Sequence, residues 1–503
     1  MKIYTPEIAF HNLQPVLSCD IRKVDDSVYK LITSGSDRHV VIWKITLSRD
    51  PNAKRPIFVE PLADLNRHQK AINVARFSPD PKIFASGDDE GNIILWKLDD
   101  GENSSDQKMV ANGFEDGDDF VNKESWVQWK VLRGHSDDVV DLCWSPSGQF
   151  LLSGSVDNMV YVWDTLSQKH TKINCHKGYI HGVAWDPLDD FLVSLSTDRV
   201  MRVFNARPPH KLVSKTSKAS VKIEGGSEKI TRLFYDDTLQ TYSRRVCFTP
   251  GGELILTPSG IIEMEDEEKN FKFINASHVF SRSCFNKPTC YLPTGKMNTI
   301  AIKCCPQLYQ LRENIESRFP FPYRIIFAVA TNESILFYDT QQPLPFAMVS
   351  GIHYTRHTDI SWSGDGRILT VCSTDGYCTF IMFQDGELGI PYDGPYYSYD
   401  PPKPVEMTPP KEPQQNSLNV SLNENQKKTP DLPKITKFFQ KLEKSEKISP
   451  DPPKLCIRSV KRKQIVGVGI TLESPSKKLK DSTPMDVSCP VLTINDDVNM
   501  SNS

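Results

Sequence analysis

Short apolar runs alternate with turn residues along the chain up to about residue 395, and residues 134–164 show the pattern most clearly. Here three runs, VVDLCW, FLLSGS and MVYVW, are separated by Ser-Pro-Ser-Gly and by Asp-Asn. Short runs bounded by Pro, Gly, Asn and Asp predict antiparallel strands. A single hairpin cannot bury its own apolar face, so we expect further copies of this unit along the chain.

Four units share one spacing between a histidine and the position that closes the last strand. The closing position lies 28 residues after the histidine, an aromatic residue lies nine after it, and an acidic residue lies six before the closing position. The sets, in the order histidine, aromatic, acidic and closing residue, are His68, Phe77, Glu90 and Trp96; His135, Trp144, Asp157 and Trp163; His176, Trp185, Asp198 and Phe204; and His353, Trp362, Asp375 and Ile381. An earlier unit keeps its second half, with Asp37 six residues before Trp43.

This repeat resembles that of the WD-repeat family, and the resemblance implies an all-β, seven-bladed β-propeller. In that family the histidine, the acidic residue and the closing tryptophan brace each blade through hydrogen bonds. We therefore interpret these polar residues as scaffold, because buried polar groups need partners. A strand around EIAF, within residues 1–10, is expected to complete the last blade and close the ring.

Two blades in the middle of the chain are degenerate. Residues 244–260 keep a strand–turn–strand pattern without Trp-Asp, and residues 323–339 end in Tyr-Asp with Asn332 six residues before Tyr338. Seven blades is our count, and this weak middle leaves eight open.

Length and charge divide the chain into two parts. A seven-bladed propeller needs about 300 residues, so 503 residues leave room for insertions and a tail. We assign residues 1–395 to the propeller and residues 396–503 to a disordered tail, in which Pro, Lys, Ser and Asn replace the strand pattern. Residues 401–503 carry a net charge of +5, and the remainder carries −8.

Membrane and secretory classes find no support in the composition. No apolar run approaches the ~18 residues of a membrane span, and the first ten residues contain no signal-peptide core. The 12 cysteines are scattered without a C-x-x-C pair, which indicates reduced thiols in an intracellular protein.

Three polar insertions interrupt the expected propeller, at residues 99–130, 207–232 and 263–270. Each is either a solvated loop or a binding loop, since connections carry function more often than framework strands do. The first insertion is acidic, and its centre, GFEDGDDF, is our candidate contact for a basic partner. The carboxylates of this centre belong to Glu115, Asp116, Asp118 and Asp119.

The tail contains one island with helical spacing. Ile435, Phe438 and Phe439 lie on one face of a helical turn. This island resembles the peptide that docks on the replication sliding clamp, although Leu432 stands where that motif begins with Gln. A docking turn for another partner is the alternative.

A second island combines basic and β-prone residues. Lys461, Arg462 and Lys463 precede an apolar run that begins with Ile465 and Val466. This order suits strand addition to a partner's sheet edge, with salt bridges fixing the register. A nuclear localisation signal is the alternative, and the two uses are compatible. Ser474, followed by Pro, is a candidate phosphorylation site, and a phosphate there adds about −1.5 to −2 charge.

Several longer stretches carry a more specific resemblance. HNLQPVLSCDI, RHQKAINVARFSP, LRGHSDDVVDLCW, VAWDPLDDFLVSLSTDRVMRV, YDTQQPLPF, CSTDGYC and ELGIP resemble the WD-repeat subunits of chromatin assembly factor 1, with the related histone-regulator propellers as the nearest alternative. The resemblance implies a nuclear, non-catalytic scaffold that helps to deposit histones three and four on newly replicated DNA, in replication and repair. The implied partners are the large and small subunits of the factor, the anti-silencing-function chaperone and the histones, with DNA mainly indirect and with no cofactor or metal.

The same resemblance gives the two candidate binding segments a role. The family's chaperone-docking peptide maps onto Lys461, Arg462, Ile465 and Val466, and the acidic insertion becomes a candidate histone contact. A substrate receptor of a cullin ubiquitin ligase is the alternative, because Arg207 stands where such propellers often carry an arginine after Trp-Asp. An enzyme is not expected, since the chain contains no Gly-rich phosphate loop, G-x-S-x-G elbow or H-E-x-x-H helix.

Overall fold

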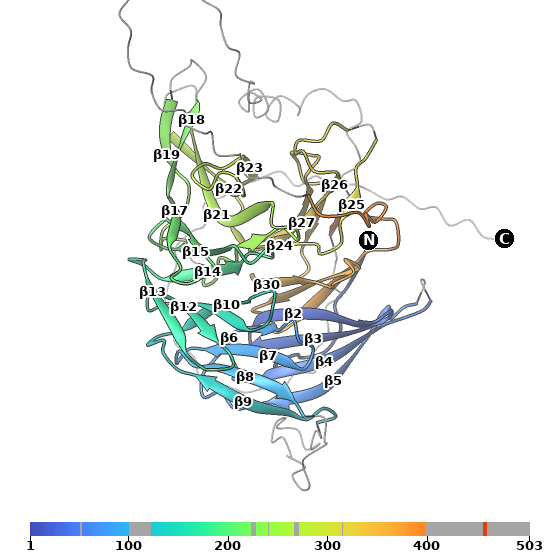
Figure 1. Cartoon of the computed structure of the whole chain (residues 1–503). Coiled ribbons are helices and arrows are strands. Elements are labelled where there is room, and N and C mark those ends of the chain that lie inside the picture. The colour runs from blue at the N-terminus through green and yellow to red at the C-terminus, as the bar shows by residue number, and fades with distance from the viewer. Residues whose placement is uncertain are drawn as a thin grey trace, which may run out of the picture. The chain divides into compact units, whose positions relative to one another are not determined.

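The computed structural model describes residues 1–50, 53–99, 122–222, 228–239, 241–265, 271–313, 315–397 and 456–459. The regular elements in these ranges are β-strands, and 28 of them form seven antiparallel sheets of four consecutive partners (Figure 1). These sheets are the blades of a β-propeller. The count of seven predicted from the repeat is therefore confirmed, and the eighth blade is not needed.

Each blade runs from a first strand to a fourth strand through successive antiparallel pairs. In that order the blades are β2 (Val16–Asp25), β3 (Val28–Gly35), β4 (Val40–Leu47) and β5 (Ile57–Leu65); β6 (Ile72–Phe77), β7 (Ile83–Asp88), β8 (Ile93–Leu98) and β9 (Trp126–Leu132); β10 (Val139–Trp144), β11 (Phe150–Ser155), β12 (Met159–Asp164) and β13 (His170–Asn174); β14 (Ile180–Trp185), β15 (Phe191–Ser196), β16 (Met201–Asn205) and β17 (Leu212–Thr216); β20 (Cys247–Phe248), β21 (Leu254–Glu265), β22 (Phe271–Ser281) and β23 (Cys290–Gly295); β24 (Thr299–Cys304), β27 (Ile326–Thr331), β28 (Ser334–Asp339) and β29 (Ala347–Ser350); and β30 (His357–Trp362), β31 (Ile368–Ser373), β32 (Cys378–Met382) and β1 (Lys2–Tyr4).

The first strands of successive blades contact one another in a closed circuit. β2, β6, β10, β14, β20, β24 and β30 follow in that order, and β30 contacts β2 again. The N-terminal strand fastens this circuit, because β1 supplies the fourth strand of blade seven by pairing with β32. Closure of this kind removes an exposed sheet edge.

The closing strand lies earlier in the chain than we predicted. It spans Lys2–Tyr4 instead of EIAF, with Pro6 just beyond it. Phe10, the last residue of EIAF, packs edge-on against Trp43 with ring centroids 4.9 Å apart, in the cluster between blades one and seven. Phe10 and the partly buried Ile8 of EIAF therefore pack in the core instead of pairing in the sheet.

Apolar side chains are buried between blades more than within them. Seven clusters of buried hydrophobic residues are present in the described part of the chain, and each joins two neighbouring blades. Trp96 and Trp163, both nearly fully buried, belong to two successive clusters. Full burial of a large apolar side chain stabilises by roughly 1.5–3 kcal/mol. Because each blade obtains this burial from its neighbours, stability depends on the complete ring.

The fourth strand of a blade lies beyond the closing position of the repeat, and this changes the boundaries of two predicted insertions. Residues 126–130 of the first insertion form part of β9, the fourth strand of blade two. The insertion at 207–232 contains β17 and a separate hairpin of β18 (Lys218–Lys222) and β19 (Glu228–Arg232). A second small hairpin pairs β25 (Tyr309–Gln310) with β26 (Tyr323–Arg324).

Two kinds of feature are absent from the described ranges. No helix there is long and apolar enough to cross a membrane. The same ranges contain no group of three or more His, Cys, Asp or Glu side chains placed to hold a metal ion.

Candidate partner-binding sites

The polar residues of the repeat brace the blades, as blade three illustrates. His135 Nδ1–H donates to Asp157 Oδ2 at 2.8 Å, and the Ser153 hydroxyl donates to His135 Nε2 at 2.7 Å. Trp163 Nε1–H donates to Ser153 Oγ at 2.8 Å. These hydrogen bonds connect His135, in the segment before β10, to three other parts of the blade. Ser153 belongs to β11, Asp157 to the turn after β11, and Trp163 to β12. The bracing predicted for this blade is confirmed.

Blade two uses a different carboxylate from the one that we predicted. His68 Nδ1 pairs with Asp88 Oδ2 at 2.7 Å, and Asp88 Oδ1 accepts the backbone N–H groups of Glu90 and Asn92. The side chain of Glu90 is exposed. The prediction of Glu90 as the bracing residue was wrong, because the turn after β7 wraps around Asp88 and directs Glu90 to solvent.

Blade one is braced by a histidine that the fixed spacing did not find. His11 Nδ1 lies 2.9 Å from Asp37, and its Nε2 lies 2.9 Å from Thr33 Oγ1, which also accepts the Trp43 Nε1–H at 2.8 Å. His11 precedes Trp43 by 32 residues instead of 28. The longer β2 and β3, of 10 and 8 residues, account for the change in spacing.

Blade seven has an incomplete brace. His353 Nδ1 pairs with Asp375 at 3.1 Å, but the position that holds Ser153 in blade three is occupied here by Val371. His353 Nε2 is buried and has no hydrogen-bond partner. Asn332, which the repeat places at the acidic position of blade six, likewise has a buried Oδ1 without a partner. Blades six and seven, where the repeat is irregular, therefore each contain a buried polar atom without a hydrogen-bond partner.

The braces also determine the ionisation of their carboxylates. Burial by itself would raise the pKa of Asp157 and Asp375, but the hydrogen bonds from His135 and His353, together with those from backbone N–H groups, outweigh it and hold both pKa values below the ordinary range. Charged carboxylates are therefore part of the folded scaffold. Because each is fully engaged by its histidine and by backbone N–H groups, neither is placed as a catalytic base.

A buried cluster of charges joins blades across the centre of the ring. Arg245 Nη1–H donates to Asp141 Oδ1 at 2.6 Å, and Arg245 Nε lies 3.0 Å from Asp359 Oδ1 in an ion pair. Arg76 Nη2 lies 2.8 Å from Asp359 Oδ2 in a second ion pair. All four side chains are nearly inaccessible to solvent. Removal of one partner from such a cluster is costly, because the remaining charge is left buried.

Sequence reasoning missed this cluster, although the repeat carries a signal for it. Asp141, Arg245 and Asp359 each lie three residues before the aromatic position of their blade, inside an apolar run. Blade four has Gly182 at this position, and a Cβ there would lie 1.9 Å from the carbonyl oxygen of Arg244. A charged residue within the apolar run of a blade's first strand therefore indicates a buried cluster of charges at the centre of the ring.

The mouth of the ring contains a cavity of about 370 Å³. Asn73 Nδ2 donates to Asp89 Oδ1 at 2.6 Å and to the Tyr242 hydroxyl oxygen at 3.2 Å, and Tyr242 donates to Asp138 Oδ2 at 2.6 Å. Burial raises the pKa of both Asp89 and Asp138. His357 belongs to the opposite wall.

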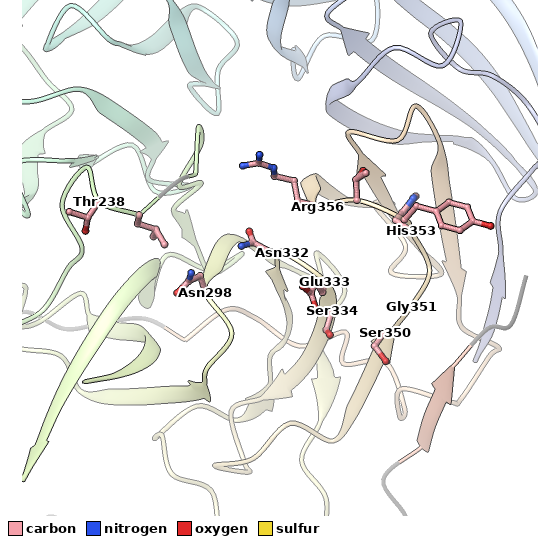
Figure 2. A pocket seen from close by; sticks show the side chains of 12 residues that line it. Thr238, Asn298, Asn332, Glu333, Ser334, Ser350, Gly351, His353 and Arg356 are labelled. Carbon is pink, nitrogen blue, oxygen red and sulfur yellow. The ribbon is translucent and has the colours of Figure 1, made fainter. Parts of the chain in front are cut away.

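A second, larger cavity of about 680 Å³ lies beside the first, and Asn332 and Arg356 line both. Figure 2 shows its labelled side chains, which come from the segment after β19, the segment before β24, the β27–β28 turn and the β29–β30 connection. Glu333 and His353 are among them. This cavity therefore spans blades five, six and seven, the part of the ring where the repeat is weakest.

The candidate binding residues predicted from the sequence lie outside the described ranges. This holds for the acidic centre of the first insertion (Glu115, Asp116, Asp118 and Asp119), the docking turn (Ile435, Phe438 and Phe439), the basic–apolar island (Lys461, Arg462, Lys463, Ile465 and Val466) and Ser474.

One short part of the tail is described, and it forms a strand. β33 (Cys456–Ser459) pairs in parallel with β29, in the register Ala347↔Cys456 to Ser350↔Ser459. Blade six is therefore a five-stranded sheet. Sequence reasoning did not predict this pairing, because four residues are too short for a period to be read.

Comparison with known proteins places the whole propeller in one family. A model of the CAF1B/HIR1 β-propeller domain matches residues 1–388. A chromatin assembly factor 1 subunit of Gallus gallus is 41% identical over 404 residues, which cover 78% of this chain and 69% of the relative. The corresponding subunits of Mus musculus and Saccharomyces cerevisiae are 42% and 33% identical, covering 78% and 75% of this chain and 68% and 84% of the relatives. The chain belongs to the CAF1B/HIR1 β-propeller family.

Proposed function

We propose that the chain is a non-catalytic scaffold subunit of a chromatin assembly factor 1 complex, acting in the nucleus to help deposit histones three and four on newly replicated DNA. The observation that carries this proposal is the similarity, over most of the propeller, to proteins named as subunits of that factor. The large and small subunits of the factor are the proposed assembly partners, and DNA is reached mainly through them.

The chemistry of the propeller favours a scaffold over an enzyme. In blades one to three the histidine is bonded to its aspartate through one ring nitrogen and to serine or threonine through the other, so neither nitrogen is left to exchange protons with a substrate. The same hydroxyl oxygen accepts the tryptophan N–H. The buried charges of Arg76, Asp141, Arg245 and Asp359 are likewise paired with one another. These side chains stabilise a rigid platform, and platforms of this kind position binding loops.

The tail supplies the proposed hook for a partner chaperone. Lys461, Arg462 and Lys463 would pair with carboxylates, while Ile465 and Val466 would add as a strand to a sheet edge of the anti-silencing-function chaperone. β33 supports this arrangement, since the basic residues begin two positions after a segment that pairs with blade six. A tethered hook raises the local concentration of a bound histone carrier near the platform.

The acidic insertion is the proposed contact for the histones themselves. Its centre carries Glu115, Asp116, Asp118 and Asp119 within five residues, and histones are basic. Clustered like charge raises the association rate of an oppositely charged partner and selects its sign.

A pulldown of the purified anti-silencing-function chaperone with the full chain tests the hook. The double substitution Arg462→Glu and Ile465→Glu reverses one charge and removes one apolar contact, so we expect about a tenfold or larger loss of binding. The matched control is Lys477→Glu with Leu479→Glu, which makes the same chemical changes in the neighbouring basic cluster and should leave binding intact.

Two results would overturn the proposal in different places. Unchanged chaperone binding by the double variant would eliminate the hook while leaving the scaffold role standing. Co-purification of the full chain with a cullin-ligase adaptor, in place of the subunits of a chromatin assembly factor, would eliminate the scaffold role.

A further inference from the structure

The cavity at the mouth of the ring gathers side chains from six blades. Asn73 is in β6 of blade two, Asp89 follows β7, and Asp138 precedes β10 of blade three. Tyr242 and Arg245 precede β20 of blade five. The remaining walls come from β2 of blade one, from β24 and the β27–β28 turn of blade six, and from β30 and the segments beside it in blade seven. Its volume of about 370 Å³ lies at the lower end of the ~300–1,000 Å³ range of small-ligand sites, so it has room for one side chain of a partner.

One wall of this cavity carries a histidine nitrogen without a partner. His357 is 2% exposed, and its Nδ1 lies 3.0 Å from the carbonyl oxygen of Thr331, so Nδ1–H is the donor. Burial lowers the pKa of His357 to about 4, so the ring is neutral and Nε2 is a hydrogen-bond acceptor. Nε2 is buried and accepts no hydrogen bond.

Two side-chain oxygens of residues that line the cavity are also buried without a hydrogen-bond partner. Asn332 Oδ1 and Thr241 Oγ1 are buried and unpartnered, and both residues line this cavity. A buried polar atom without a partner costs about 1–3 kcal/mol. Unsatisfied atoms of this kind cluster at sites where a ligand completes the hydrogen bonding.

Two carboxylates in the lining of the cavity, those of Asp89 and Asp138, contribute negative charge. Asp89 and Asp138 each accept one hydrogen bond from a neutral side chain, and no salt bridge joins either carboxylate to a basic residue of the described ranges. Burial comes first among the causes that raise the pKa of each, and the charges of neighbouring aspartates, Asp137 among them, raise both further. A cation brought between the two carboxylates would relieve this repulsion.

The charges near the cavity are not all negative. Lys70 lowers the pKa of Asp89, and the exposed Arg356 lines both cavities. Arg245 also lines this cavity, and its charge is paired with Asp141 and Asp359. The carboxylates of Asp89 and Asp138 therefore favour binding of a cation on the side of blades two and three. The positive charge of Arg356 opposes the binding of a second cation in the same cavity. The guanidinium group is such a cation, because its N–H donors lie in one plane and can reach several separate acceptors.

We propose that this cavity binds the guanidinium group of one arginine side chain from an incoming basic peptide, with the carboxylates of Asp89 and Asp138 as its ion-pair partners and with His357 and Asn332 in the surrounding lining. The proposal goes beyond the proposed function, because it requires no particular assembly. It adds to the platform a specific anchor at its centre, distinct from the tail hook and from the acidic insertion.

Fluorescence anisotropy of labelled pentapeptides on the full chain tests the proposal. The probes are Gly-Gly-X-Gly-Gly peptides in which X is arginine, lysine, citrulline or norleucine. Citrulline has nearly the shape of arginine without the charge, so the arginine peptide should bind at least about tenfold more tightly than the citrulline peptide. Similar binding of these two peptides, or binding of the lysine peptide as tight as that of arginine, would overturn the guanidinium assignment.

Charge-neutralising variants locate the site. Asp89→Asn and Asp138→Asn keep the size of the side chain and an acceptor for the bonds from Asn73 and Tyr242, and each should weaken the arginine peptide by about tenfold. Asn332→Leu should weaken it severalfold through loss of one acceptor. Asp237→Asn is the matched control, since it removes one exposed carboxylate outside the cavity lining and should change affinity little.

The variants are compared only when their circular dichroism spectra and melting temperatures match those of the parent. Unchanged affinity in both cavity variants, or an equal loss in Asp237→Asn, would show that the peptide responds to net charge alone and would overturn the proposal.

Discussion

Blades three and seven share a histidine, a carboxylate and an aromatic residue at corresponding positions, but they differ in how completely these are joined. In blade three His135 is bonded on both sides, and Ser153 connects it to Trp163. In blade seven Val371 stands in the place of the serine and Ile381 in the place of the tryptophan, so His353 keeps a single partner. The complete brace therefore satisfies the polar groups of its own histidine, serine and tryptophan.

The irregular blades leave polar atoms that a ligand can use. His353 lines the larger cavity and His357 lines the cavity at the mouth, and both have an unpartnered Nε2. Both histidines belong to blade seven, beside the degenerate blade six. In this propeller, then, the repeat residues stabilise the ring, while departures from the repeat mark the surfaces available to partners.

Cutting the brace of blade three should have the strongest effect on stability. Ser153→Ala removes the donor to His135 Nε2 and the acceptor of the Trp163 Nε1–H, both of which are buried. Loss of these two partners should lower the free energy of unfolding by about 2–4 kcal/mol. Urea denaturation followed by tryptophan fluorescence measures the change.

The exposed Ser167 provides the control for that experiment. Ser167→Ala deletes the same hydroxyl from a surface turn, so it should change stability by less than about 0.5 kcal/mol. Equal effects of the two serine variants would contradict the bracing role.

An effect of intermediate size concerns the acid sensitivity of blade seven. Burial, with His353 as a lesser cause, lowers the pKa of His357 to about 4 from its ordinary 6.5. As pH falls below 6.5 the unfolded chain binds a proton that the folded protein refuses, so stability decreases by about 1.4 kcal/mol at pH 5.5. Blade three has Val139 at the corresponding register position.

His357→Val should therefore remove this part of the acid sensitivity. The difference in unfolding free energy between pH 7.5 and pH 5.5 should shrink by about 1.4 kcal/mol relative to the parent. His181 and His278, whose burial also lowers the pKa to about 4, should preserve the rest of the acid sensitivity. An identical pH dependence in the variant would show that His357 does not carry the effect.

A weaker effect should follow from repairing the brace of blade seven. Val371→Thr places a hydroxyl at the position that Thr33 occupies in blade one, where it bonds the histidine Nε2 at 2.9 Å. The new donor to His353 Nε2 should outweigh the lost methyl contact and raise the free energy of unfolding by about 0.5–1 kcal/mol. Val371→Ala, which removes volume and adds no donor, should instead destabilise by about 1–3 kcal/mol. If the two variants were equally destabilised, the missing hydroxyl would not explain the blade.

The contrast between the blades also separates what a sequence can and cannot predict. The repeat predicted seven blades and the bracing of blade three, because a fixed spacing identifies side chains that meet in every copy. It failed at His11 and at Glu90, where a longer strand and a tight turn shifted the partner by a few residues. The cavity at the mouth was beyond prediction, since Asn73 and His357 lie 284 residues apart and meet only because the ring closes.

Blade six extends the contrast to the rim, where stability should change least. Its fourth strand, β29, pairs with β33 over four residues. In a parallel ladder alternate residues direct their N–H and C=O groups to the same neighbour, so of two adjacent residues one bonds β29 and the other faces away. Proline removes an N–H and is tolerated in a strand where that N–H is unpaired.

Ile457→Pro and Arg458→Pro therefore form a matched pair. Hydrogen exchange read by mass spectrometry on the full chain should show protected amides in Ala347–Ser350 in the parent and in one proline variant, and faster exchange in the other. Global stability should change by less than about 0.5 kcal/mol in both, because β24, β27, β28 and β29 pair with one another independently of β33. Rapid exchange of these amides in the parent would show that the rim of blade six stays open, and the propeller would then offer a free sheet edge in the very blade where its repeat has lost the brace.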